Sequence, residues 1–533
     1  MMNPVDMPRA RTIPALLAEQ AGRYGDLDAL VAGDRRYSYG TLWEEVQRFG
    51  RGLLAHGVTP GDHVAILMGN RPEWIIADLA IASIGATMVS VNTYVTAAEL
   101  EYILKHSDAD WLIHASRFLK YDYVDILGQI GDLSERLPRL RGFIHAGERG
   151  LPGSAPIERI ATLGAGKAAR FDELAAAVKP TDVAALLYTS GSTSTPKGVQ
   201  IIHWPLIENM WHIGSRMHAV PGDRIWCAIS MFWGLGCENI LFNALTHAAC
   251  LVLQEFFDPG EAMRLIEAER CTIFYGTSNM VLAMQEHPDR PHRDMTTLRT
   301  GGSSGNREQN ARIVGFGATE MCNVYGLTES YGYCNIIDGR TEQHKRDVSV
   351  GRPLPGIEQR IVDPETQALC EPGEIGEIQI RGTVTIGYYK DADKNADAFT
   401  GDGFFRTGDL GFHDDEGFLY FRGRLKEMIK TGGINVSPAE VEKKLLEHPH
   451  VHLAYVVPVA DPVQTEIVGA VVIAGPDADP ATLEDELRAL ASGLSSYKRP
   501  RLYTFVRESE LPTTNTGKVK RMDLPALFTP ADA

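Results

Sequence analysis

The sequence predicts an α/β protein with two helix-covered parallel sheets, followed by a small β-rich part and an α+β unit. Three observations carry this prediction. Short apolar runs alternate with amphipathic stretches up to about Ile336, short strands and many turns follow from about Gly351, and helices mixed with strands close the chain. Strand–helix–strand alternation of the first kind produces parallel strands with helices on their faces.

The first parallel sheet is expected within residues 64–114. Pro72 suits the first turn of a helix over 72–82, and a second helix is expected over 97–105. Asp78 interrupts the most apolar long stretch, which therefore fits a buried helix and strand better than a membrane span. The flanking apolar runs predict strands at 64–68, 87–91 and 111–114.

The same alternation returns from Val183 to about Ile336. It predicts a second doubly wound subdomain, with strands near 184–188, 225–229, 249–253 and 272–275. Residues 145–169 lie between the two series and are rich in Gly, Pro and Ala, which predicts a surface loop.

Turn sequences dominate residues 351–422, among them Asp363-Pro, Glu371-Pro-Gly and Gly401-Asp-Gly. Short strands between such turns predict a small antiparallel sheet or β-barrel. The C-terminal part is expected to be α+β, with helices at 438–447 and 480–492 and strands at 454–459 and 467–474. We expect a large N-terminal domain over 1–424 and a C-terminal domain over 425–533.

Composition excludes several classes of protein. The chain has 533 residues, and 52 Lys and Arg against 69 Asp and Glu give a net charge of -17, which argues against a general grip on nucleic acid or anionic lipid. The seven cysteines form no Cys-x-x-Cys pair, so reduced, mostly buried thiols are expected rather than a closed zinc site. The N-terminal residues lack the apolar core of a signal peptide. We expect a cytoplasmic enzyme without an integral membrane segment.

The strongest motif is the loop Tyr188-Thr-Ser-Gly-Ser-Thr-Ser-Thr-Pro-Lys-Gly198, which follows an apolar strand. Hydroxyl groups and exposed backbone N–H groups suit a polyphosphate, and Lys197 adds a positive charge. The Walker A order of residues is absent. Alone, the loop could equally be a solvated Ser/Thr loop.

Three further motifs are weak when taken singly. In Tyr325-Gly-Leu-Thr-Glu-Ser330, a carboxylate among hydroxyl groups could hold Mg²⁺, and an aromatic ring could stack on a purine. In Arg406-Thr-Gly-Asp-Leu-Gly411, an aspartate after a turn could accept from ribose hydroxyls. Asn515-Thr-Gly-Lys-Val-Lys-Arg521 could be no more than a basic tail.

Together, the order and spacing of the four motifs resemble the adenylate-forming superfamily of acyl-CoA synthetases, peptide-synthetase adenylation domains and beetle luciferases. The resemblance is greatest to acyl-CoA synthetases and runs from about Ile13 to Leu527. It includes Gly69-Asn-Arg-Pro-Glu-Trp74 and Gly432-Gly-Ile-Asn-Val-Ser-Pro-Ala-Glu-Val-Glu442. It implies that a carboxylate attacks the α-phosphate of ATP to give acyl-AMP and pyrophosphate, and that CoA then displaces AMP.

The resemblance also implies roles for individual residues. Thr328 would contact the α-phosphate and Glu329 would carry Mg²⁺, with Lys518 as the catalytic lysine that bridges the carboxylate and the α-phosphate. Because two anions must meet, this amine must stay protonated. The family's C-terminal lid rotates between the half-reactions, which would place the hinge at Lys426 and bring Gly432 and Gly433 to CoA. The implied ATP contacts are Thr189, Ser190, Gly191, Ser192, Thr193, Lys197, Gly302, Ser303, Asn323, Tyr325, Gly326, Asp409 and Arg424.

Two positions depart from the family pattern. Ser194 stands where the family usually has Gly, so the loop is either stiffer or offers an extra hydroxyl. Trp233 stands where the family often has His, and could cap a bulky ring, shorten the acyl pocket or simply pack in the core. The acyl pocket is expected to include Trp233, Gly234, Tyr275 and Tyr331, with a largely apolar lining and no Lys or Arg. Glu238 is expected on a helix, facing away from this pocket.

The leading hypothesis is an ATP- and Mg²⁺-dependent acyl-CoA ligase for a hydrophobic carboxylic acid. An adenylation enzyme that loads a phosphopantetheinyl carrier protein is the alternative. A non-catalytic ligand-binding relative and a luciferase-type oxygenase are two further hypotheses that the same motifs allow. The sequence leaves a homodimer open.

Overall fold

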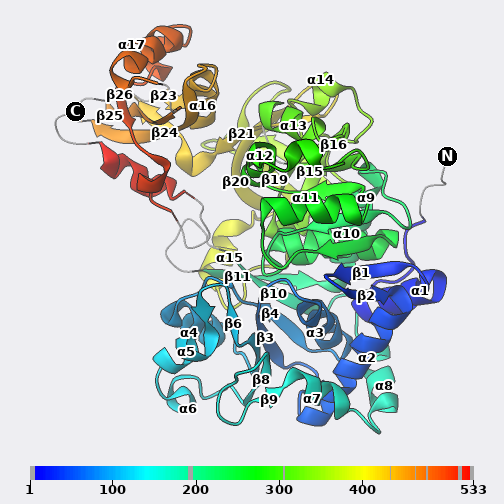
Figure 1. Cartoon of the computed structure of the whole chain (residues 1–533). Helices are drawn as coiled ribbons and strands as arrows, with labels where there is room; N and C mark the ends of the chain where they lie inside the picture. Colours follow the sequence, from blue (N-terminus) through cyan, green and yellow to red (C-terminus); the bar gives the residue numbers. More distant parts are fainter. Residues whose placement is uncertain are drawn as a thin grey trace. The chain divides into compact units, whose positions relative to one another are not determined.

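The computed structural model describes residues 6–189, 196–303, 307–431, 434–461, 464–475, 478–513 and 519–528 (Figure 1). The chain divides into two compact units, the first formed by residues 1–358 and 380–405 and the second by 359–379 and 406–533. The mixed α/β architecture, with a large N-terminal and a small C-terminal part, confirms the predicted fold class. The division after residue 424 and the mobility of the lid stay predictions.

A seven-stranded sheet in the order β11-β10-β4-β3-β5-β8-β9 forms one half of the first unit. Its strands are parallel except β11, which runs antiparallel to β10. The strands and helices expected within 64–114 are confirmed. The strands are β3 (His63–Leu67), β4 (Thr87–Ser90), β5 (Trp111–Ala115), β8 (Gly142–Ala146), β9 (Ala155–Pro156), β10 (Val183–Thr189) and β11 (Lys197–Ile202).

Local signals start and stop the helices of this half. Ser38 and Thr41 form a capping box at the start of α2, and Gly57 ends it with φ 109°. Thr96 and Glu99 form a second capping box on α4. The helices are α1 (Ile13–Tyr24), α2 (Tyr39–His56), α3 (Pro72–Ser83), α4 (Ala97–His106), α5 (Tyr123–Gln129), α6 (Leu133–Arg136), α7 (Ile157–Thr162) and α8 (Ala168–Ala177).

The surface loop expected at 145–169 is wrong in part, because α7 forms inside it. Ile157, Ile160 and Ala161 are buried and share one face of this short helix. The helix packs against α2, where a Cβ on Gly52 would lie 2.0 Å from the Ile160 carbonyl oxygen. Packing against α2 therefore stabilises α7, a helix that the composition of this segment does not predict.

An eight-stranded sheet in the order β17-β16-β15-β14-β12-β13-β1-β2 forms the other half of the first unit (Figure 1). The edge strands β17 and β2 are antiparallel to their neighbours, and the remaining pairs are parallel. The strands are β1 (Asp28–Ala32), β2 (Arg35–Ser38), β12 (Arg224–Cys227), β13 (Cys250–Leu253), β14 (Ile273–Tyr275), β15 (Thr300–Ser303), β16 (Glu320–Leu327) and β17 (Gly332–Ile336).

Some strands join a different sheet from the one that their order in the sequence suggests. β10 and β11 join the first sheet, whereas the N-terminal strands β1 and β2 join the second. The helices of the second half are α9 (His203–Arg216), α10 (Leu241–His247), α11 (Pro259–Ala268), α12 (Ser278–Glu286), α13 (Arg307–Val314) and α14 (Gln343–Arg346), and α15 (Ala392–Ala398) lies further along the same unit.

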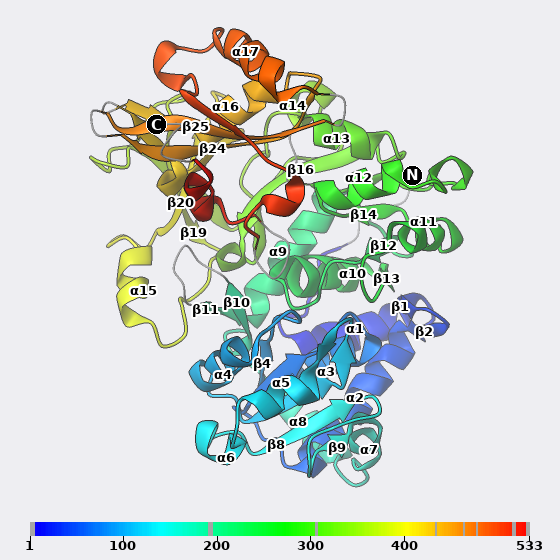
Figure 2. The same cartoon turned by 60° about the vertical axis from the view of Figure 1, so that its left-hand side comes forward.

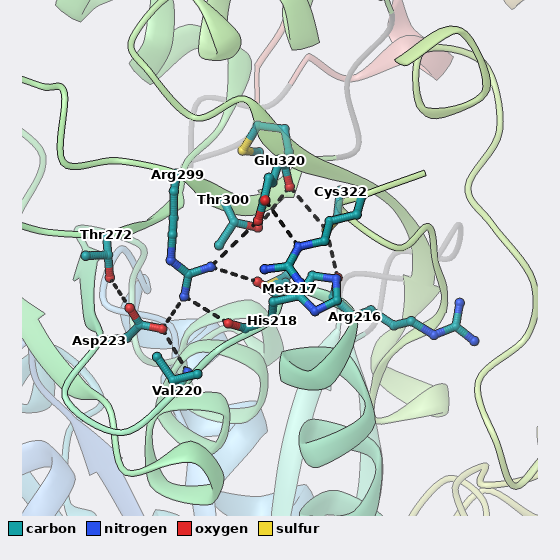
Figure 3. Close-up of polar contacts among 12 residues, drawn as sticks. Arg216, Met217, His218, Val220, Asp223, Thr272, Arg299, Thr300, Glu320 and Cys322 are labelled. Carbon is teal, nitrogen blue, oxygen red and sulfur yellow. Dashed lines mark hydrogen bonds and ion pairs between the residues drawn. The ribbon is translucent and has the colours of Figure 1, made fainter. Parts of the chain in front are cut away.

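Arg299 is the centre of a polar network at the amino-terminal edge of β14, β15 and β16 (Figure 3). Its guanidinium pairs with Asp223 and donates to the carbonyl oxygens of Met217, at 3.2 Å, and His218, at 2.9 Å. The Thr272 hydroxyl donates to the other oxygen of Asp223 at 2.8 Å. The network thereby ties the loop before β12 to the strands beside it.

The second unit holds two sheets. The small β-rich part is a four-stranded sheet in the order β18-β19-β20-β21, and the C-terminal sheet contains β22 to β26 with α16 and α17 packed against each other (Figure 2). Val441, Leu445, Leu483 and Leu487 share one core with strand residues such as Val456. The elements are β18 (Ile357–Val362), β19 (Gly376–Gly382), β20 (Phe405–His413), β21 (Leu419–Arg424), β22 (Ile429–Thr431), β23 (Ile434–Val436), α16 (Pro438–Leu445), β24 (Val451–Asp461), β25 (Thr465–Ala474), α17 (Pro480–Ala491) and β26 (Leu502–Phe505).

The cysteines are buried except Cys370, which is partly exposed, and this agrees with the mostly buried thiols that the sequence predicts. Among the described residues, none of the helices has the length and apolar character needed to span a bilayer.

Asp78 makes the stability of the fold depend on pH. Its side chain is buried on α3, and burial raises its pKa to about 7. The unfolded chain releases this proton near pH 4, so stability that is complete below pH 4 is lost as pH rises through 7. We expect Asp78→Asn, neutral at every pH, to stabilise the protein by up to about 4 kcal/mol at pH 8 and by only about 1 kcal/mol at pH 4.5.

Thermal unfolding of wild type and variant at both pH values measures this effect. Asp393→Asn, an exposed position on α15, is the matched control and should show no such difference between the two pH values. An equal gain from Asp78→Asn at both pH values would contradict the assignment.

Candidate functional site

The carboxyl ends of β14, β15 and β16 bring several predicted ATP contacts to one edge of a parallel sheet. Tyr275 pairs in register with Gly302, and Ser303 pairs with Asn323. A Cβ on Gly302 would lie 3.0 Å from Met217 Cε, at the end of α9, so the glycine lets this helix side chain approach the strand closely. Ligands of open α/β sheets bind at this edge.

The turn from Tyr325 to Gly332 leads out of this edge. β16 ends in a short 3₁₀ helix, Thr328–Ser330, after which Tyr331 has φ 51° and Gly332 has φ 80°. The Ser330 hydroxyl donates to the Gly332 carbonyl at 2.8 Å. A Cβ on Gly326 would lie only 2.0 Å from that carbonyl oxygen, which excludes any side chain there. The left-handed, non-glycine Tyr331 stores backbone strain beside the predicted phosphate contact Thr328.

Glu329, the predicted magnesium ligand, is held by the segment 385–389. The Tyr388 hydroxyl donates to Glu329 Oε1 at 2.7 Å, and the Thr385 amide donates to the Glu329 carbonyl oxygen at 2.6 Å. The Thr385 hydroxyl also donates to the Gln200 carbonyl at 2.7 Å. One segment therefore joins the Glu329 turn to strand β11.

The predicted phosphate loop leaves the sheet next to the same segment. Thr189 and Lys197 are paired in register at the ends of β10 and β11. The Lys197 ammonium lies 4.6 Å from the centroid of the Tyr388 ring, a cation–π distance. Tyr388 thus contacts both the lysine of the loop and the carboxylate of Glu329. Residues 190–195 lie outside the described ranges, among them the predicted contacts Ser190, Gly191, Ser192 and Thr193 and the departure Ser194.

Asp409 and Arg424, the predicted ribose-binding residues, lie in the second unit. They are paired in register on β20 and β21, and Arg424 Nε is 3.3 Å from Asp409 Oδ1. Asp409 is almost completely buried, and Arg424 is one of its partners. Lys426, the predicted hinge, lies in the 3₁₀ helix Leu425–Glu427. The predicted residues Gly432, Gly433 and Lys518 lie outside the described ranges.

Trp233 follows a loop that is anchored to the first sheet of the unit. The Asn70 side chain donates to the Ile229 carbonyl at 2.8 Å and accepts from the Met231 amide at 2.8 Å. The Ser90 hydroxyl donates to the Phe232 carbonyl at 2.6 Å. Trp233 itself is 37% exposed, so it does not pack in a core formed by the described residues.

The two tyrosines assigned to the acyl pocket are fixed by hydrogen bonds. Tyr275 is fully buried and accepts from Asn243 Nδ2 at 2.8 Å. Tyr331 is also fully buried, and its hydroxyl oxygen accepts from the Ile202 amide at 3.3 Å. Both phenol oxygens are therefore engaged by the scaffold.

Glu238 lies beside Gly234, a residue assigned to the acyl pocket, whereas the sequence predicts that it faces away from this pocket. It lies in a π-helix, Leu235–Ile240, and is only 2% exposed. A Cβ on Gly234 would lie 2.3 Å from Glu238 Oε2 and 3.4 Å from Thr328 Oγ1. Burial, with the negative charge of Glu329, raises the pKa of Glu238 well above its usual range. π-Helical turns are rare and occur frequently at functional sites.

Other buried polar groups continue along the same segment. Asn239 in the π-helix and Asn243 on α10 are fully buried. Their side-chain oxygens have no hydrogen-bond partner in the described part of the chain. These buried side chains carry polar atoms that the expected apolar lining of the acyl pocket does not include. Their spacing of four residues is the signal that places them on one helical face.

Comparison with known proteins gives the family. The AMP-binding enzyme profile matches residues 17–389, and the AMP-binding enzyme C-terminal domain profile matches residues 440–518. The chain belongs to the AMP-binding enzyme family. YngI of Bacillus subtilis (strain 168), which carries the name of an acyl-CoA synthetase, is 34% identical over 534 residues and 96% of both chains. The medium-chain acyl-CoA ligase ACSF2 of Bos taurus is 32% identical over 96% of this chain and 87% of its own.

Solved structures of family members have the same fold. The anthranilate CoA ligase AuaEII, in complex with anthranoyl-AMP, has a TM-score of 0.82 and 25% identity over 98% of both chains. The o-succinylbenzoate CoA synthetase MenE from Bacillus subtilis, in complex with OSB-AMP, has a TM-score of 0.76 and 25% identity, and covers 96% of this chain and 97% of its own. Family membership and these relatives make the chain an AMP-forming acid–thiol ligase.

Tyr388→Phe tests the contact that holds Glu329. Removing a hydrogen bond to a charged group costs about 1.5 kcal/mol, so we expect adenylation to slow roughly tenfold at limiting Mg²⁺ and less at saturating Mg²⁺. Pyrophosphate release measured over a Mg²⁺ titration gives both values.

Tyr389→Phe is the matched control, because the Tyr389 hydroxyl donates to Asp108 instead, at 2.9 Å. It should leave the Mg²⁺ dependence unchanged. Equal effects of the two variants would mean that the Tyr388 hydroxyl has no specific role.

Proposed function

We propose that the protein is an ATP-dependent acyl-CoA ligase that activates a carboxylic acid with an apolar body as acyl-AMP and transfers the acyl group to CoA. The observation that supports this most is the contact of Tyr388 with both Lys197 and Glu329. It gathers a cation and a carboxylate at the turn that follows β16. A polyphosphate and its divalent cation require this combination of groups.

The residues around Glu329 fit a magnesium ion. Carboxylate and hydroxyl oxygens are the ligands that Mg²⁺ prefers, and Glu329 with the neighbouring Thr328 supplies both kinds. Tyr388 donates to one carboxylate oxygen and thereby orients the group. When bound there, Mg²⁺ would offset negative charge on the phosphates.

The chemistry of adenylation needs positive charge rather than a general base. The acid is already ionised at neutral pH, so nothing has to remove a proton from it. Two anions must nevertheless approach each other, and the protonated amine of Lys518 would stabilise the charge that develops at the α-phosphate. Thr328 would hold the α-phosphate, while Lys197 would pair with the outer phosphates.

A panel of carboxylic acids tests the proposal. Chain length, ring content and substituents near the carboxylate are varied, and pyrophosphate release is measured with ATP and Mg²⁺. Thioester formation is then followed with CoA and, separately, with a phosphopantetheinyl carrier protein. The proposal requires an acyl-AMP for at least one acid and transfer to CoA. Transfer to the carrier protein alone would support the alternative of an adenylation enzyme that loads a carrier.

Lys518→Ala should slow adenylation by two to four powers of ten, about 3–5 kcal/mol, because no other group replaces the charge that meets both anions. Single-turnover formation of acyl-AMP is the measurement. Lys520→Ala, which removes a lysine two positions away, should have little effect. Pyrophosphate release by Lys518→Ala at the wild-type rate would refute the role of Lys518.

Lys426→Pro should separate the two half-reactions. Proline fixes φ, so a hinge at this position could no longer change its backbone conformation between the two steps. We expect acyl-AMP to form at close to the wild-type rate and thioester formation to be lost. Lys426→Ala, which keeps the backbone free to rotate, should retain both steps. Equal loss of both steps in the proline variant would contradict a hinge at Lys426.

A further inference from the structure

The Glu238 carboxyl group is buried without a partner. Its side chain is 2% exposed, and neither carboxyl oxygen has a hydrogen-bond partner among the described residues. Burying such a group without compensation costs several kcal/mol, and buried polar groups in folded proteins are normally hydrogen-bonded. A buried acceptor of this kind therefore calls for a partner beyond the described residues, such as a bound molecule.

The position of Glu238 relates it to the predicted reaction centre. Its Oε2 and the Thr328 hydroxyl oxygen both lie within 3.4 Å of one point, which a Cβ on Gly234 would occupy. Glycine at 234 leaves that point open. If Thr328 holds the α-phosphate, the carboxylate of the substrate must lie close by. A group that meets Glu238 would then be attached only a few bonds from that carboxylate.

The described titratable groups that interact with Glu238 supply no positive charge. Titratable neighbours that interact with it electrostatically are Glu329, Cys237 and Tyr331. The hydroxyl oxygen of Tyr331 accepts from the Ile202 amide at 3.3 Å, and Tyr331 forms no hydrogen bond with Glu238. The pocket segments 230–239 and 325–335 contain neither Lys nor Arg. Within the described structure the unmet requirement at Glu238 is thus for a hydrogen-bond donor, and a cationic donor would in addition favour the ionised form of the carboxyl group.

We propose that Glu238 binds an N–H or O–H donor carried by the substrate close to its carboxylate, so that the enzyme prefers amino- or hydroxy-substituted acids to their apolar counterparts. This inference rests on the proposed function and narrows its substrate class. An apolar body would still face the aromatic part of the pocket. A donor matched to Glu238 would remove the cost of its burial, whereas a methyl group of the same size would leave it unpaired.

Matched acids test the preference. One series compares 2-aminobenzoate and 2-hydroxybenzoate with 2-methylbenzoate, and another compares 3-aminobutanoate and 3-hydroxybutanoate with 3-methylbutanoate. We expect wild type to prefer the donor-bearing acids in at least one series by tenfold or more in kcat/KM for pyrophosphate release. Glu238→Met keeps the volume but removes the acceptor, and should abolish the preference while retaining activity on the methyl acid. Glu238→Gln, which still accepts a hydrogen bond, should keep more of the preference for hydroxy acids than for amino acids.

One control variant and two contrary outcomes complete the test of Glu238. Asp78→Asn removes another buried carboxyl group of the same unit and should leave the ratio of the two kcat/KM values unchanged. Equal use of donor and methyl acids by wild type, or a preference that persists in Glu238→Met, would overturn the role of Glu238.

A binding measurement separates this inference from the proposed function. Stable acyl-sulfamoyl adenosines made from the same acids mimic acyl-AMP and need no turnover, and calorimetry gives their affinities for wild type and Glu238→Met. Absence of pyrophosphate release with every acid would count against the proposed ligase reaction. A tenfold tighter binding of the donor-bearing analogue, lost in Glu238→Met, would still support the role of Glu238, and equal binding would overturn it.

Discussion

The contact of one phenol with two charged groups organises the site. Tyr388 donates to Glu329 and lies under the ammonium of Lys197, and the neighbouring Thr385 fastens the same segment to β11. These residues are far apart in the sequence, so the turn at Glu329 and the exit of the phosphate loop depend on a third segment. The position of this segment therefore sets the distance between Lys197 and Glu329, which would both contact the nucleotide.

Glycines determine how closely the remaining parts approach. Gly302 and Gly326 lie where a Cβ would contact a neighbouring side chain or carbonyl oxygen, and the strained Tyr331 follows at once. The motif Tyr325-Gly-Leu-Thr-Glu-Ser330 is thus a tightly folded turn at the end of a parallel strand. Its chemistry and its backbone geometry are consequences of the same residues.

Much of the fold could be predicted from the sequence, because buried parallel strands are continuous apolar runs and the helices begin with recognisable caps. Non-local pairing could not: β1 and β2 are separated from β13 by about 200 residues, and no local pattern says which sheet they join. Helix α7 was hidden because Gly and Pro dominate its surroundings. Its buried face consists of only three residues.

For the site, the sequence identified the residue types but not the direction of Glu238. A single acidic residue on a helix normally faces water, and only the packing of Gly234 and Thr328 around it reverses that expectation. Trp233 illustrates the opposite case, since a large aromatic residue is expected in a core and is here substantially exposed.

The Arg299 network stands at the amino-terminal edge of the strands whose carboxyl ends carry the predicted nucleotide contacts (Figure 3). Ion pairing and backbone anchoring are concentrated at the first edge, while small residues and strained turns occupy the second. The same strands therefore carry stabilising contacts at one end and the predicted nucleotide contacts at the other. Substitutions at the first edge would therefore alter the stability of the sheet, whereas substitutions at the second edge would alter the predicted nucleotide contacts and leave the scaffold in place.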